Sequence, residues 1–191
     1  MVLWLVLAAA IIVAGGYLLI NKKFVPPDFY EARNNSAAVA QEIVTVTETS
    51  LKNLEEISLQ DRQHNFKKAL SLVRQELERS KESRLKAIDL TKQLGNMTVA
   101  ANEIFPTKAR NLAIEAISQE LNLITHLILY NETYLNGLLQ TLELKFSEDI
   151  RYDSDDVQKL VKNMNNEARE INRLNNLFNE KMRGFDDLVK T

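Results

Sequence analysis

The sequence predicts an all-α protein in which one N-terminal transmembrane helix is followed by an elongated antiparallel helical bundle with a coiled-coil-like pattern. Three observations support this fold class: an uncharged apolar run near the N-terminus, only 5 Gly and 3 Pro in 191 residues, and apolar residues that recur every three or four positions. Few Gly and Pro residues imply few turns and long helices. We expect an anchor over residues 1–23, a proline-containing linker over 24–34 and a helical body over 35–191.

The N-terminal apolar run covers residues 2–20, which contain no charged side chain. As a helix it would span about 28 Å, close to the thickness of the hydrocarbon core of a bilayer. Trp4 and Tyr17 stand near its ends, where interfacial aromatic residues are expected, and Lys22 and Lys23 follow as a polar stop. Because no basic residue precedes the run, an uncleaved anchor is favoured over a cleaved signal peptide.

The charges that flank this run favour a cytoplasmic body. No Lys or Arg precedes the run, whereas Lys22, Lys23 and Arg33 follow it, and basic residues near a membrane helix concentrate on the cytoplasmic side. The contrast is small because the amino terminus adds a positive charge on the other side, so an extracytoplasmic body is the alternative. The sequence therefore predicts a single-pass membrane protein, with the lipid bilayer as one of its partners.

Two helices are expected in the first half of the body. The first covers about residues 30–57, and the following Ser58-Leu-Gln-Asp61 has the spacing of a capping box, so this helix either breaks there or continues. One of its faces carries a modest apolar stripe. Its members, spaced four and three positions apart, are Ala40, Val44, Thr47, Leu51 and Leu54.

The boundaries of the later helices are predicted from Gly, Pro and acidic residues. The second helix should end near Leu94, because Gly95-Asn96 is typical of a helix end, and the mixed charges of residues 78–84 within it indicate a solvated surface. Pro106 should start or kink the third helix, because its nitrogen cannot donate a hydrogen bond. A polar connection then leads to the fourth helix, for which Asp153 is the expected N-cap.

The third and fourth helices carry the most regular apolar patterns and should form an antiparallel hairpin. Apolar residues alternate by four and three positions in both. On the third helix this stripe consists of Ile117, Leu121, Ile124, Ile128, Asn131, Leu135, Leu138 and Leu142. On the fourth it consists of Val157, Val161, Met164, Ala168, Ile171, Asn175, Phe178, Met182, Phe185 and Val189.

Two asparagines interrupt these stripes at core-type positions. There Asn131 and Asn175 would cost stability but could fix the helical register or the number of chains, and we expect leucine at either position to raise thermal stability while loosening assembly. The alternative is that each lies at the edge of the core and meets water or a tyrosine hydroxyl. Tyr130 and Tyr134 widen the apolar face of the third helix. These four residues are the candidates for interaction or register.

The composition argues against most chemical functions. A net charge of -2 with both signs interspersed leaves no basic surface for nucleic acid, and the absence of Cys excludes thiolate catalysis and thiolate metal sites. Imidazoles occur only at His64 and His126. Asp61 precedes His64 by three residues, but a di-metal bundle requires a second such pair, which His126 does not provide. We expect no catalytic residue, no cofactor and no bound metal.

Long helices with apolar stripes favour a protein that works by binding. We expect a non-enzymatic, single-pass, membrane-anchored helical scaffold or adaptor, which mediates protein–protein interaction near the bilayer by holding a protein partner or further copies of itself through its helical faces. The alternative is an extracytoplasmic envelope protein or a ligand-sensing helical bundle that takes a small molecule between its helices.

Overall fold

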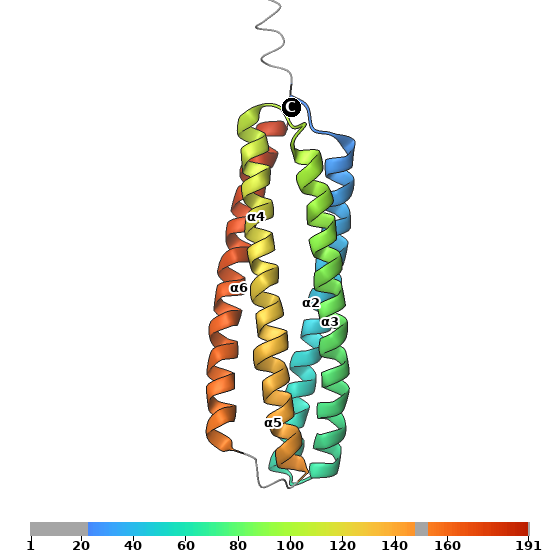
Figure 1. The fold of residues 1–191 in the computed structure, drawn as a ribbon, viewed down its shortest axis with the longest axis vertical. Helices are drawn as coiled ribbons and strands as arrows, with labels where there is room; N and C mark the ends of the chain where they lie inside the picture. The colour runs from blue at the N-terminus through green and yellow to red at the C-terminus, as the bar shows by residue number, and fades with distance from the viewer. Residues whose placement is uncertain (1–22, 148–152, 191) are drawn as a thin grey trace, which may run out of the picture.

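The computed structural model describes residues 23–147 and 153–190, which form a long helical bundle (Figure 1). In chain order the helices are α2 (Pro27–Arg62), α3 (Phe66–Ala101), α4 (Thr107–Leu129), the π-helical turn η1 (Tyr130–Leu135), α5 (Asn136–Phe146) and α6 (Ser154–Val189). α4, η1 and α5 follow one another without interruption and form one long helix. Apart from an isolated bridge between Phe24 and Phe105, the described residues contain no β structure, so the predicted all-α fold class is confirmed.

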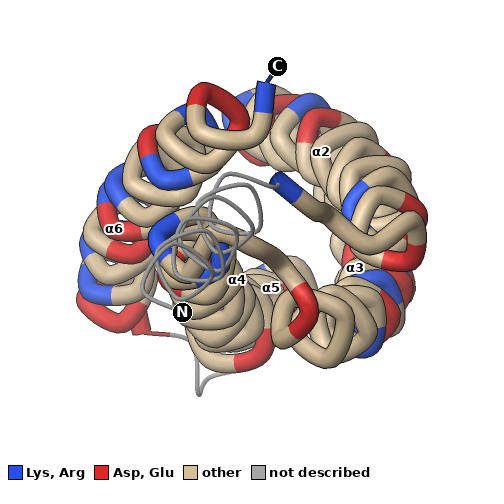
Figure 2. Tube along the Cα trace, turned by 90° about the horizontal axis from the view of Figure 1, so that it is seen from above, with Lys and Arg blue, Asp and Glu red and all other residues tan. Residues whose placement is uncertain are grey.

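The helices are arranged in a ring in the order α2, α3, α4–α5 and α6. α2 packs along α3, α3 packs against α4 and α5, and α6 packs along α4. The predicted antiparallel hairpin of the third and fourth helices is thereby confirmed. Viewed from one end, most charged residues lie on the outer faces of the helices (Figure 2). At 1.5 Å per residue, the 36 residues of α2, α3 and α6 give a bundle about 54 Å long.

The predicted membrane helix over residues 2–20 lies outside the described residues, and so do Trp4, Tyr17 and Lys22. Within the described part of the chain, one helical stretch, Thr107–Phe146, is long and apolar enough to cross a membrane, judged by length and composition alone. α3 and α6 pack against this stretch. Part of its apolar surface is therefore buried in the bundle core.

α2 is longer at both ends than predicted. It begins at Pro27, so most of the expected linker over 24–34 is helical. Proline suits the first position of a helix because its φ angle is already helical and the amide hydrogen it lacks would be unpaired there. The helix also continues past Ser58 to Arg62, and the chain turns only at residues 63–65, where His64 adopts a φ of 58°. The capping-box spacing therefore does not start a new helix.

The predicted helix end at Gly95 is wrong. α3 continues through this glycine to Ala101, because Leu94, Met97 and Ala101 on the same helix are buried in the core. This packing outweighs the cost of about 1 kcal/mol for a glycine inside a helix. The chain turns instead after Ala101, and α4 starts directly after Pro106, as one of the two alternatives for that proline predicted.

The predicted start of the fourth helix is confirmed. α6 begins at Ser154, and an Asp153 carboxylate oxygen accepts a hydrogen bond from the backbone N–H of Asp155 at 2.9 Å. Asp155 and Asp156 place negative charge in the first turn, which the positive end of the helix dipole favours.

The core consists of two apolar clusters separated by polar residues. The proximal cluster, nearer the termini, contains Phe29 and Phe185, and the distal cluster contains Val73 and Leu139. Between Ala87 of the proximal cluster and Val73 of the distal one, α3 carries three further residues that are buried and polar: Glu76, Ser80 and Ser83. The prediction of a solvated surface over residues 78–84 is therefore wrong for both serines, whose small side chains allow the neighbouring helix to approach.

Candidate ligand-binding cavity

A cavity of about 440 Å³ lies between α2 and α6, next to α4 and η1. Most of its wall is aliphatic, with Ile43 on α2, Leu90 on α3, Leu127 on α4 and Ile171 on α6. Among the described residues, α2 and α6 have no close backbone contact with each other, although they are neighbours in the ring. The cavity occupies the space that a closed four-helix bundle would fill at this seam.

The α2 wall of the cavity includes the whole apolar stripe predicted from the sequence. All five members, Ala40, Val44, Thr47, Leu51 and Leu54, line the cavity. Val44 and Leu51 remain 47% and 51% exposed, and no residue from Val44 to Glu56 is fully buried. The middle of α2 therefore presents an apolar face that the described part of the chain leaves uncovered.

The proximal end of the seam is closed by a contact between α2 and α6. The rings of Phe29 and Phe185 are fully buried, with their centroids 5.2 Å apart. Arg33 donates two hydrogen bonds to the Asp186 carboxylate, at 2.6 and 2.9 Å. These bonds hold the pKa of Asp186 below its ordinary value. Lys23, which the sequence assigns to the anchor, donates to the Lys190 carbonyl at 2.8 Å at the same end.

At the other end of the seam, α2 is tied to α5. Lys145 forms an ion pair and a hydrogen bond with Asp61, and the distal apolar cluster packs beside it. Asp61 is thus engaged in an ion pair, and His64 lies in the turn after α2 instead of on the helix. The described residues contain no group of three or more His, Cys, Asp or Glu side chains that could hold a metal ion.

A single buried carboxyl group lies in the inner wall of the cavity. Glu120 on α4 is only 8% exposed, and its Oε2 atom has no hydrogen-bond partner. Burial raises the pKa of Glu120 to about 7, because water no longer stabilises the ionised form. Glu48, on α2, is the other charged residue of the lining, which contains no Lys, Arg or His among the described residues. The charge of the cavity is therefore negative or neutral, depending on pH.

Neutral polar groups lie farther along the cavity, at the π-helical turn. Asn131 is 7% exposed, and its Nδ2 donates to the Leu127 carbonyl at 2.9 Å and to Ser83 Oγ at 3.5 Å. Tyr130 precedes it in the turn, and burial raises the pKa of its phenol, so the hydroxyl stays neutral. A π-helical turn inserts an extra residue into a helix and is frequent at functional sites. Here it coincides with the polar layer between the two apolar clusters.

Three of the four candidates for interaction or register line this one cavity. Tyr130, Asn131 and Asn175 come together there from η1 and α6. Asn175 is exposed and, with Asn172, faces the cavity from α6, while Tyr134 packs against the distal cluster instead.

Sequence reasoning missed Glu120 and placed its neighbour Leu121 in the core stripe. In the structure Leu121 is 36% exposed, and Glu120 is buried in its place. A second spacing pattern on the same helix could have identified it. The buried residues of this pattern are Ala109, Ala113, Ala116, Glu120, Ile124, Leu127 and Asn131.

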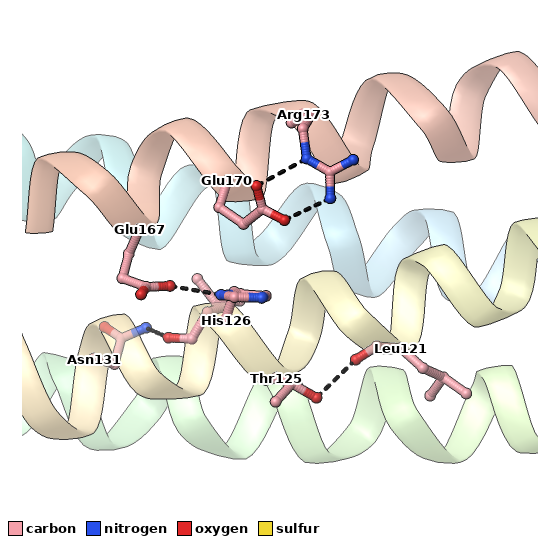
Figure 3. Close-up of polar contacts among 8 residues, drawn as sticks. Leu121, Thr125, His126, Asn131, Glu167, Glu170 and Arg173 are labelled. Atoms are coloured by element: carbon pink, nitrogen blue, oxygen red, sulfur yellow. Dashed lines mark hydrogen bonds and ion pairs between the residues drawn. The ribbon is translucent and has the colours of Figure 1, made fainter.

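His126 lies outside the cavity lining and shares a hydrogen bond with Glu167. Its Nδ1 lies 2.6 Å from a Glu167 carboxylate oxygen, which links α4 to α6, and Glu170 pairs with Arg173 one turn farther along α6 (Figure 3).

No protein-family model, curated protein or solved structure matches the chain. The cavity and its residues are therefore the basis for a functional assignment.

Proposed function

We propose that this protein is a membrane-anchored helical bundle that binds a small, largely apolar molecule in the cavity between α2 and α6. The observation that carries the proposal is the cavity itself, with a volume of about 440 Å³, aliphatic walls and a few polar groups. Ligand sites commonly measure about 300–1,000 Å³, combine apolar walls with a few placed polar groups, and occur between the helices of bundles.

The exposed apolar side chains of α2 supply a driving force for binding. Val44 and Leu51 are about half exposed, although both lie on the stripe that faces the cavity. Removing apolar surface from water contributes about 25 cal/mol per Å². A ligand seated against this stripe would cover it without requiring α2 to move onto α6.

The expected anchor over residues 1–23 would place this binding activity at the membrane surface. An apolar molecule concentrates in and near a bilayer, and a single-pass helix would hold the cavity close to that supply. Binding requires no catalytic group, so the proposed protein is not an enzyme. The flanking charges favour a cytoplasmic body, and a sensing or envelope role would place it on the other side.

Calorimetric titration of the full chain in lipid nanodiscs with 1-decanol tests this proposal. We expect saturable binding beyond the partitioning measured with empty nanodiscs. Ala168, which lines the cavity, provides the blocking variant Ala168→Phe, and the exposed Ala38 provides the matched control Ala38→Phe. Binding should be lost in the first variant and kept in the second. If the native chain takes up no more decanol than empty nanodiscs do, the proposal is wrong.

A scaffold or adaptor remains the second candidate, and the same exposed stripe favours it. Val44 and Leu51 are separated by seven positions, as are the anchor residues of a helix that packs against a partner helix. In this case the double substitution Val44→Glu with Leu51→Glu would reduce the mass of the assembly in analytical ultracentrifugation. The ligand-binding proposal predicts an unchanged mass and the loss of decanol binding.

A further inference from the structure

We infer that the molecule bound in the cavity carries a basic amine, which forms an ion pair with the carboxylate of Glu120 on the inner wall. This inference rests on the proposed function and adds the chemical class of the ligand. Glu120 is 8% exposed, and its Oε2 atom has no partner within the described residues. An unpaired buried carboxylate is costly, and an ammonium group supplies both the opposite charge and the missing hydrogen-bond donor.

The cavity lining also disfavours a negatively charged ligand. Its two charged residues, Glu48 and Glu120, are both acidic, and no Lys, Arg or His lines the cavity in the described part of the chain. A ligand carboxylate or phosphate would meet repulsion and no counter-ion. Discrimination between ligands commonly depends on such an unfavourable contact as well as on favourable ones.

The positions of the polar groups indicate an elongated ligand. Glu120 and Asn131 are eleven residues apart on the α4–η1–α5 helix, which corresponds to about 16 Å. Leu123 and Leu127 line the cavity between them, and Ile171 does so from α6. An apolar chain with its amine at Glu120 would therefore lie along aliphatic side chains toward the neutral polar groups at Asn131.

Ion pairing of an ammonium ligand with Glu120 would also release the proton of the Glu120 carboxyl group. The other titratable groups of the lining are Glu48 on α2 and Tyr130 on η1, whereas α3 and α6 contribute none. Because burial raises the pKa of Glu120 to about 7, this carboxyl is partly protonated at neutral pH. An ammonium ligand favours the carboxylate, so binding releases the carboxyl proton to the buffer. Calorimetry in two buffers with different ionisation enthalpies measures that release.

The experiment compares decylamine, 1-decanol and decanoate on the full chain in zwitterionic nanodiscs, with empty nanodiscs subtracted. Decylamine should bind the native chain at least about ten-fold more tightly than decanol, as expected for a desolvated charge pair. It should also release protons near pH 7, and decanoate should bind most weakly. Glu120→Gln should abolish the amine preference while it still binds decanol, which shows that the cavity is intact.

The matched control is Glu115→Gln on the same helix, outside the cavity lining and paired with Lys181. This variant should keep the amine preference. Equal affinities of the native chain for decylamine and decanol, tighter binding of decanoate, or an amine preference that persists in Glu120→Gln would overturn the inference. If none of the three probes binds saturably, the proposed function fails and this inference fails with it.

Discussion

Glu120 provides a test of the cavity that needs no ligand, because its burial makes stability depend on pH. We consider the substitution Glu120→Gln, which keeps the size of the side chain and removes its charge. In the unfolded chain the carboxyl titrates at its ordinary pKa of 4.5, whereas in the bundle burial raises this pKa to about 7. Between these two values the folded state binds more protons than the unfolded state, so stability falls as pH rises.

The size of this effect follows from the pKa difference. Each unit of pKa shift corresponds to about 1.4 kcal/mol, so the ionised carboxyl destabilises the bundle by up to about 3 kcal/mol above pH 7. Below about pH 4.5 the group is protonated in both states and the penalty is absent. Glutamine does not titrate. We therefore expect Glu120→Gln to be more stable than the native chain at high pH by about 3 kcal/mol more than at low pH.

Thermal unfolding of the full chain in mild detergent, followed by circular dichroism at about pH 4 and about pH 8.5, measures this difference. For a chain of this length the expected gain in Tm at the higher pH is roughly 6–12 °C. Glu115→Gln, which removes an exposed carboxyl from the same helix, should change stability by less than about 1 kcal/mol. If Glu120→Gln raises Tm equally at both pH values, or lowers it more at the higher one, Glu120 is not desolvated as described.

Three further predictions concern the packing around the cavity, and thermal unfolding measures each of them. The structure reverses the sequence-based expectation that leucine at position 131 raises thermal stability: Asn131→Leu should destabilise the bundle by about 1–3 kcal/mol, because it removes the hydrogen bonds of Asn131 Nδ2 to the Leu127 carbonyl and to the buried Ser83 hydroxyl. Asn175→Leu, at an exposed position, should stay within about 0.5 kcal/mol, and stabilisation by Asn131→Leu would contradict these hydrogen bonds. Phe185→Ala should cost about 3–5 kcal/mol, and a loss below about 1 kcal/mol would mean that the proximal end of the seam is not packed as described. Arg33 lowers the pKa of Asp186, so their ion pair contributes stability above the ordinary pKa range of a carboxyl and loses it as pH falls. Arg33→Gln should therefore remove up to about 1 kcal/mol at neutral pH and less in acid; an equal loss at both would refute this account.

Much of the architecture could be predicted from local signals in the sequence. Pro106 and Asp153 mark the starts of α4 and α6 because each acts within one helical turn, through a missing donor and a side-chain cap. Gly95 misled the prediction because a glycine ends a helix only where packing does not hold the next turn, and the buried Leu94 and Met97 hold it here. This packing depends on tertiary contacts, which the Gly95-Asn96 dipeptide alone does not reveal.

The cavity could be predicted only in part. Asn131 and Asn175 are recognisable in the sequence because they are polar residues at core-type positions, and Tyr130 because it widens an apolar helix face. All three line the cavity. Glu120 was missed because a strict alternation of four and three selects Leu121, whereas the real stripe contains two consecutive steps of four, from Ala116 to Glu120 and on to Ile124. The heptad rule also assumes that every seam closes, so it cannot predict the open seam between α2 and α6.

The polar residues of this core also bear on the choice between the two proposed functions. Leucine at position 120 would remove an unpaired buried carboxyl, and it would complete the stripe that runs from Ala116 to Ile124. A bundle that served only as a spacer or scaffold would be more stable with that sequence, because a buried polar group without a partner costs free energy that an apolar one does not. Partner docking on Val44 and Leu51 would use the exposed face of α2 and would not require a carboxyl group on the inner wall. Ligand binding accounts for both features, because the same molecule covers the apolar stripe and supplies a partner to Glu120.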